Sequence, residues 1–191
     1  MDNIKIPIET PKERTLFFAS QVDQKSISDL SKAIIEINAH DKMLKELYKI
    51  HGLDYNPKPI KIYIDSYGGY IYQCFGLLSI MEASKTPIHT IATGAAMSCG
   101  FMILISGHKR FGYTRCTPMY HQASSGGSGK VKELEEDLIE TKRLQKMIER
   151  VTLEKTKISK EQLKANYKLK KDWFMTAEEA LKLKVIDKII K

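Results

Sequence analysis

The segment 94–100, with the sequence GAAMSCG, places Ser98 where a run of strand type gives way to an apolar helical run. A hydroxyl at a helix start lies beside unpaired backbone N–H groups and the positive end of the helix dipole. The small residues before and after it leave space for a substrate carbonyl. Ser98 is therefore a candidate nucleophile, although an ordinary helix N-cap explains the same pattern.

A serine nucleophile needs a base, and the chain contains five histidines. His121 differs from the other four because it ends the strand-like segment 118–120 and precedes a Gly/Ser-rich stretch at 124–130. The carboxyl ends of strands are where a parallel sheet presents functional groups. His121 is the candidate base, and a structural histidine at a strand end is the alternative. The others are His40, His51, His89 and His108.

The carboxylate that would orient this imidazole must come from elsewhere in the chain. Asp172 lies between a lysine-rich stretch and the apolar segment 173–175, so we expect it to be partly desolvated and aimed inward. Gly68 and Gly69 follow a predicted strand, and their amides are free to point at an oxyanion. A tight turn is the simpler explanation for this glycine pair.

Apolar spacing predicts strands that alternate with helices, the pattern of a parallel α/β domain. Segment 94–96 is expected to be a turn of small residues, and segment 39–59 a surface excursion with one helical turn. The predicted strands are 15–19, 60–65, 88–93, 111–113, 118–120 and 185–190; the predicted helices are 28–38, 70–83, 98–106, 131–154 and one opened by a capping box at Thr176.

The composition is that of an ordinary soluble globular chain: 191 residues, 42% hydrophobic, with a net charge of +8. The lysines are scattered, so we expect no nucleic-acid partner. No apolar run reaches eighteen residues and no signal peptide is visible, so we expect no membrane association. Three cysteines without paired spacing indicate reduced thiols and a cytoplasmic location.

The order Ser98, His121, Asp172, in these sequence contexts, resembles the ClpP family of Clp protease proteolytic subunits. The segments 62–69 (IYIDSYGG, where the family's usual Pro is Tyr67) and 180–187 (ALKLKVID) extend the resemblance from about residue 14 to residue 190. It implies an α/β fold of the ClpP/crotonase type, a spiral of repeated β-β-α units. That fold would form a single domain over 1–191, with a projecting handle helix in a handle region at about 123–158.

The resemblance also implies roles for particular residues in a serine endopeptidase. Ser98 would be the nucleophile, His121 the general base and then acid, and Asp172 the residue that fixes the imidazole tautomer. The backbone N–H groups of Gly69 and Cys99 would form the oxyanion hole. The Gly/Ser stretch before the handle would pair as a strand beside the substrate.

The resemblance further implies partners: copies of the chain in stacked rings, a tetradecamer in this family, and peptides or unfolded proteins as substrates. No cofactor is expected in this chain, because ATP would be used by a partner unfoldase. Only residues 1–13 precede the first predicted strand, whereas the family has a longer segment that helps to seat the unfoldase, so docking of a Clp ATPase stays open. Segment 39–59 is longer than usual and the loop 123–129 lacks the common Pro-Leu-Gly-Gly form, which indicates a divergent, phage-encoded or paralogous member.

Three alternatives remain: a catalytically silent ring or scaffold subunit, a crotonase-type acyl-CoA enzyme, and a Ser-Lys peptidase.

The predicted helix 131–154 also carries an apolar seam among its charges. We expect that so long a projecting helix cannot bury this seam against its own domain and buries it against a partner subunit; a helix lying flat on the domain surface is the alternative. The seam consists of Leu134, Leu138, Leu144, Met147, Ile148 and Val151.

Overall fold

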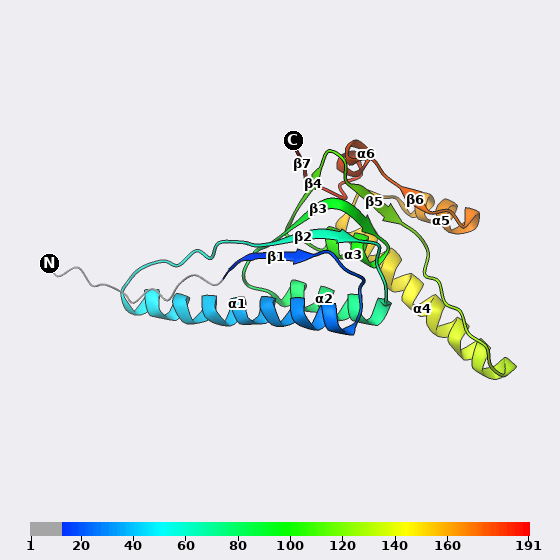
Figure 1. The fold of residues 1–191 in the computed structure, drawn as a ribbon, viewed down its shortest axis with the longest axis horizontal. Coiled ribbons are helices and arrows are strands. Elements are labelled where there is room, and N and C mark those ends of the chain that lie inside the picture. The colour runs from blue at the N-terminus through cyan, green and yellow to red at the C-terminus, as the bar shows by residue number, and fades with distance from the viewer. Residues whose placement is uncertain (1–12) are drawn as a thin grey trace.

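The computed structural model describes residues 13–191, so the expectations for the first twelve residues lie outside the described part of the chain. Strands alternate with helices along this part (Figure 1), as the apolar spacing predicts. The elements are β1 (Thr15–Phe18), α1 (Gln24–Ile50), β2 (Ile60–Ser66), α2 (Ile71–Ala83), β3 (Ile88–Met97), α3 (Cys99–Ile105), β4 (Lys109–Tyr113), β5 (Thr117–Tyr120), α4 (Val131–Lys155), α5 (Lys160–Leu169), β6 (Trp173–Phe174), α6 (Ala177–Lys182) and β7 (Lys188–Ile190).

A mostly parallel sheet runs in the order β1-β2-β3-β4-β7. The first part of β3 pairs with β4, and its last three residues pair with β5, where Met97 lies opposite Met119. Strand β6 adds antiparallel to β5. The long strand β3 thus carries two successive parallel neighbours, and its end lies beside the end of β5.

The predicted turn at 94–96 is wrong, because these residues continue β3 up to Met97. The Asp65 side chain covers this stretch: its carboxylate accepts a hydrogen bond from the Ala95 N–H at 2.8 Å. A Cβ at Gly94 would lie 2.8 Å from the same carboxylate. The small residues therefore serve close packing under Asp65 rather than a change of chain direction.

The core lies between the sheet and the helices on its faces. Helices α1 and α2 lie side by side along the sheet (Figure 1). The alternate residues Ile60, Ile62 and Ile64 of β2 are fully buried, as the period-two pattern predicts. Helix α3 is buried on all sides, so truncating one of its large side chains should cost about 2–5 kcal/mol.

Helix α1 is much longer than predicted, because residues 39–50 continue it instead of forming an excursion. Leu44, Leu47 and Tyr48 are partly buried and extend the helical apolar spacing of the preceding turns. The buried Asp41 interrupts that spacing in the sequence, but its carboxylate is held by an ion pair with Arg14. The helix ends at His51, before Gly52 with φ 68°.

Helix α4 projects from the body of the molecule (Figure 1), and its seam divides into two halves. Leu134 and Leu138 are exposed, whereas Leu144 and Ile148 are buried against the chain's own core. The expectation that the whole seam needs a partner subunit is therefore wrong for the second half. Only the first half of α4, up to about residue 139, presents an uncovered apolar face in this chain.

The C-terminal part follows the predictions in outline. Thr176 caps α6, and its hydroxyl accepts a hydrogen bond from the Glu179 N–H. Strand β7 is shorter than predicted, because Val185 and Ile186 are buried in the turn before it. Residues 121–130 have no regular structure, so their pairing with a substrate strand stays a prediction.

Candidate active site

Ser98 lies at the junction of β3 and α3 in an unusual backbone conformation, with φ 54° and ψ −119°. A positive φ in a non-glycine residue is strained and is found most often at functional sites. The junction is crowded, because a Cβ at Gly68 would lie 2.7 Å from the Ser98 Cβ. A Cβ at Gly100 would lie 2.8 Å from the Ser66 carbonyl oxygen. Glycines on both sides therefore let the chain make this sharp strand-to-helix turn.

His121 is brought to the same edge of the sheet by strand pairing. The Ser98 N–H donates to the Met119 carbonyl at 2.9 Å, which fixes the end of β5 against the β3–α3 junction. His121 is the first residue after β5. Ser98 and His121 line one cavity of about 60 Å³, together with Gly69 and Cys99.

Asp172 lies beside His121, with 3.4 Å between the Asp172 Oδ1 and the His121 Nδ1. This separation is longer than a strong hydrogen bond, and such contacts in free enzymes commonly tighten when substrate binds. The Asp172 side chain is 55% exposed and that of His121 is 27% exposed. The predicted desolvation of Asp172 is therefore wrong: the carboxylate stands before strand β6 at the mouth of the site.

Gly69 is held beside Ser98 by a parallel bridge to Val22. In this bridge the Val22 N–H donates to the Gly68 carbonyl and the Tyr70 N–H donates to the Val22 carbonyl. The bridge therefore uses groups on either side of the Gly69 N–H and not that group itself. Gly69 has φ 151°, and a Cβ there would lie 2.3 Å from the Val22 carbonyl oxygen, so the position requires glycine.

Cys99 begins α3, so its backbone N–H has no carbonyl acceptor within the helix. Its thiol donates to the Gly69 carbonyl at 3.3 Å and so ties together the two residues predicted to form the oxyanion hole. The hydrogen bond with the Cys74 side chain lowers the pKa of the Cys99 thiol, and the same bond together with burial raises the pKa of Cys74.

Gln145 belongs to the site and was missed by sequence reasoning. It is buried on α4, where its side-chain oxygen accepts from the Ala123 N–H at 2.7 Å and its amide nitrogen donates to the Tyr120 hydroxyl at 3.4 Å. These contacts hold the chain on both sides of His121. The only signal in the sequence is a glutamine between Leu144 and Ile148 of the apolar seam.

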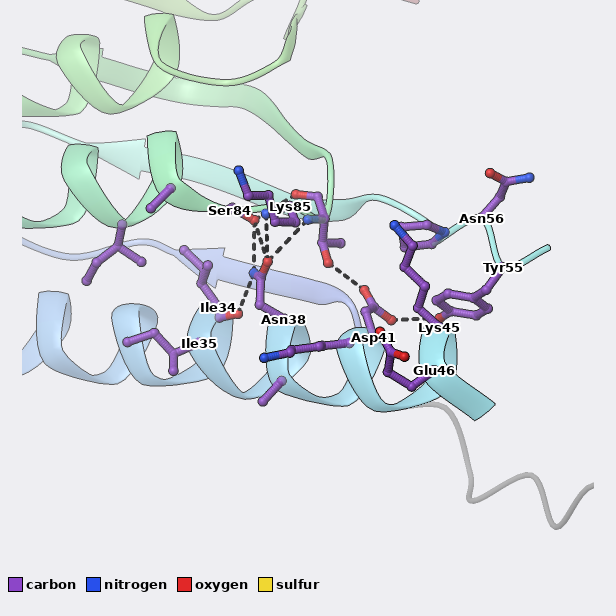
Figure 2. Close-up of a pocket in the computed structure, with 16 residues that line it drawn as sticks. Ile34, Ile35, Asn38, Asp41, Lys45, Glu46, Tyr55, Asn56, Ser84 and Lys85 are labelled. Carbon is purple, nitrogen blue, oxygen red and sulfur yellow. Dashed lines mark hydrogen bonds between the residues drawn. The ribbon is translucent and has the colours of Figure 1, made fainter. Parts of the chain in front are cut away.

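A larger cavity, of about 730 Å³, lies away from Ser98, between α1 and segment 84–86 (Figure 2). The Asn38 and Asp41 side chains, which line it, are already hydrogen-bonded. Asn38 bonds to Ser84 and to the N–H groups of Lys85 and Thr86. The Asp41 carboxylate accepts from Arg14, Tyr55 and Thr86. The smaller cavity, which brings a serine and a histidine together, therefore remains the candidate active site.

Within residues 13–191, no group of three or more His, Cys, Asp and Glu side chains is arranged to hold a metal ion. No helix in that range is both long and apolar enough to span a bilayer. The absence of a cofactor stays a prediction.

The protein has an α/β fold with a mostly parallel sheet. At one edge of that sheet lie a strained serine and a His–Asp pair, an arrangement typical of α/β hydrolytic enzymes. Residues 4–191 match the Clp protease family. The chain is 33% identical over 138 residues to the ATP-dependent Clp protease proteolytic subunit of Deinococcus radiodurans, covering 71% of this chain and 67% of that protein. It is 29% identical over 181 residues to the ATP-dependent Clp protease proteolytic subunit 2 of Bacillus licheniformis, covering 94% of this chain and 87% of that protein.

This chain belongs to the Clp protease family. The resemblance found in the sequence and the predicted ClpP-type α/β fold are both confirmed. The catalytic roles of the five site residues, the chamber and the single-domain boundaries stay predictions.

Proposed function

We propose that this protein is a serine endopeptidase that cleaves peptides or unfolded proteins by a Ser98–His121–Asp172 triad. The observation that carries the proposal is that Ser98 and His121 line one cavity while Asp172 lies 3.4 Å from His121. The strained backbone at Ser98 supports the same role, because it presents the hydroxyl at the end of the sheet. Membership in the Clp protease family adds independent support.

In this mechanism, His121 takes the proton of the Ser98 hydroxyl as the oxygen attacks the scissile carbonyl. The resulting oxyanion accepts hydrogen bonds from the N–H groups of Gly69 and Cys99. His121 then gives the proton to the leaving amine, and a water molecule releases the acyl group from Ser98 by the same steps. Asp172 holds the imidazole in the tautomer whose free nitrogen faces Ser98.

A fluorophosphonate probe tests the nucleophile directly. We expect wild-type protein to gain one adduct, which mass spectrometry of the digested protein locates on Ser98. Ser98→Ala should lose the adduct and nearly all peptidase activity while keeping its fold. Ser79→Ala is the matched control, because this exposed serine of α2 lies outside the cavity. Full peptidase activity in purified Ser98→Ala protein would refute the assignment.

Non-additivity tests whether the three residues act as one unit. The double variant Ser98→Ala/His121→Ala should be scarcely less active than the worse single variant, since members of a triad fail together. Independent, multiplicative losses would contradict a shared mechanism.

We further propose that copies of this chain assemble through the exposed half of α4 into stacked rings, with the active sites inside a cytoplasmic chamber. The uncovered Leu134, Leu138 and Ile139 support this assembly, since exposed apolar patches commonly mark interfaces. A Clp ATPase would be the partner that uses ATP to feed unfolded substrates into the chamber. The expected particle has about fourteen times the 21.8 kDa mass of one chain.

Light scattering tests this assembly. Leu138→Glu should dissociate the particle without unfolding the chain, because Leu138 is exposed in the single chain. Lys146→Glu changes charge on an exposed position of the same helix outside the seam and should leave the particle intact. A wild-type protein that hydrolyses peptides as a stable monomer would overturn the chamber.

A further inference from the structure

A second cavity, of about 380 Å³, adjoins the candidate active site and shares His121 with it. One wall comes from α4, with Leu138 and Lys142, and the other from the end of α5 and the residues after it, with Tyr167, Lys170 and Lys171. Asp172 completes it. We name this space the lysine-rimmed cavity. Three lysines therefore line the space directly beside His121.

The charge of this cavity is unbalanced. Asp172 is the one acidic residue that lines it, and this carboxylate lies against His121. In the chain from residue 13 onward, none of the three rim lysines forms an ion pair, whereas Lys155 pairs with Glu82 and Lys132 with Glu135. The rim therefore presents a positive potential that the fold does not neutralise.

The backbone that carries two of these lysines is fixed. Lys170 ends α5 in the left-handed conformation, with φ 51° and ψ 39°, a place where glycine is the usual residue. The buried Asn166 side chain donates to the Lys171 carbonyl at 2.9 Å. A lysine in the left-handed region is less favourable than glycine there. The helix cap and the Asn166 hydrogen bond therefore fix where both lysines leave the backbone, next to Asp172 in the sequence.

We propose that the lysine-rimmed cavity is a subsite for an acidic side chain, Asp or Glu, of the bound peptide near the scissile bond. This inference rests on the proposed serine peptidase function and names its preferred substrate class. A carboxylate placed between Lys142 and the Lys170–Lys171 pair gains attraction from several cations in a partly enclosed space. Tyr167 offers apolar contact to the methylene groups of the same side chain.

The test uses peptide pairs that differ only by Glu or Gln, placed in turn at each of three positions on either side of a constant cleavage site. Wild-type protein should cleave the Glu peptide with a kcat/KM about tenfold higher at one position, a difference of about 1.4 kcal/mol. The ratio should shrink as salt rises from about 0.05 M to about 0.5 M, since exposed charges are screened.

Two variants distinguish an effect of the three rim lysines from an effect of the overall positive charge of the protein. Lys142→Gln/Lys170→Asn/Lys171→Gln should bring the Glu/Gln ratio close to one by lowering kcat/KM for the Glu peptide. Asparagine is chosen at position 170 because it tolerates the left-handed conformation. Lys164→Gln is the control, an exposed lysine of α5 outside the cavity, and it should keep the wild-type ratio. Circular dichroism checks that the triple variant is folded.

Two failures are distinguishable. Equal cleavage of every Glu and Gln peptide by wild-type protein, or an unchanged ratio in the folded triple variant, would overturn the acidic subsite and leave the peptidase in place. Cleavage of no peptide, with no probe adduct on Ser98, would overturn the proposed function itself.

Discussion

Two aspartates at distant parts of the molecule are treated in opposite ways by the fold. Asp41 on α1 has a side chain that is 7% exposed, and its carboxylate accepts hydrogen bonds from Arg14, Tyr55 and Thr86. Figure 2 shows Asp41 beside Tyr55. Asp172 is 55% exposed and has a single charged partner, His121, at 3.4 Å. The first carboxylate is saturated with donors, and the second keeps most of its acceptor capacity open.

The difference separates a structural carboxylate from the carboxylate of the proposed triad. A buried charge is tolerated only when it is paired and hydrogen-bonded, so Asp41 must be enclosed by donors that the helix, the strand and the loop supply together. In the proposed triad, Asp172 instead acts on the tautomer and orientation of the His121 imidazole and encloses no buried charge of the fold. We therefore expect changes at Asp41 to alter stability and changes at Asp172 to alter rate.

The largest effect is expected at Asp172. Asp172→Asn keeps the shape but leaves the imidazole free to adopt the wrong tautomer, so kcat should fall by about 10³–10⁴-fold. Because the side chain is exposed, the melting temperature should change by no more than about 2 °C. Peptide kinetics and thermal unfolding measure the two quantities on one sample. Asp54→Asn, at an exposed site, is the control. A variant that loses stability but not rate would reverse the distinction.

Asp41 should give the opposite result. Asp41→Ala leaves the Arg14 guanidinium buried without its anion, which should lower the free energy of unfolding by about 3–5 kcal/mol. The kcat/KM of the protein that remains folded should stay within about twofold of wild type. Urea unfolding followed by circular dichroism measures the loss, with Asp54→Ala as the control. An unchanged unfolding midpoint would show that the Asp41 ion pair does not stabilise α1.

A single donor to Asp41 should matter less. Thr86→Val keeps the volume and removes the hydroxyl that donates to the Asp41 Oδ2. The expected loss is about 1–3 kcal/mol, because a buried carboxylate oxygen loses one of its donors. Thr93→Val is a useful comparison, since the Thr93 hydroxyl donates to the Ile64 carbonyl rather than to a charged group. An equal or larger loss at Thr93 would weaken the case that the charge makes the Thr86 contact important.

The smallest expected effect is the dependence of the unfolding free energy on acid pH through Asp41. Burial raises the pKa of the Asp41 carboxyl. The hydrogen bonds from Arg14, Thr86 and Tyr55 lower that pKa by more than burial raises it, so it lies below its ordinary value of 3.8. The stabilisation is therefore complete above the unfolded-state pKa and is lost as the pH falls through the folded-state pKa. Between pH 7 and pH 3, wild-type protein should lose more unfolding free energy than Asp41→Asn. Parallel curves would contradict this linkage.

Much of the fold and of the candidate site followed from local pattern. The alternation Ile60, Ile62, Ile64 gave β2, and small residues around Ser98 marked the strand-to-helix junction. Where a polar residue had a distant partner, the same reasoning failed. The mixture of polar residues, Gly52 and prolines in segment 39–59 predicted an excursion, but α1 continues to Ile50 with Asp41 paired to Arg14, and only the part after it lacks helix.

Local pattern was enough for most of the strands and helices, for the serine at a strand end and for the histidine after β5, because apolar spacing and small residues report on only a few neighbouring positions; it missed α5 and β6. Only the tertiary structure decided that Asp172 is exposed and that Leu144 packs inward while Leu138 does not. It also decided that three lysines surround the cavity next to His121. Those features depend on which distant elements meet, and no local spacing encodes the partner that covers a given face.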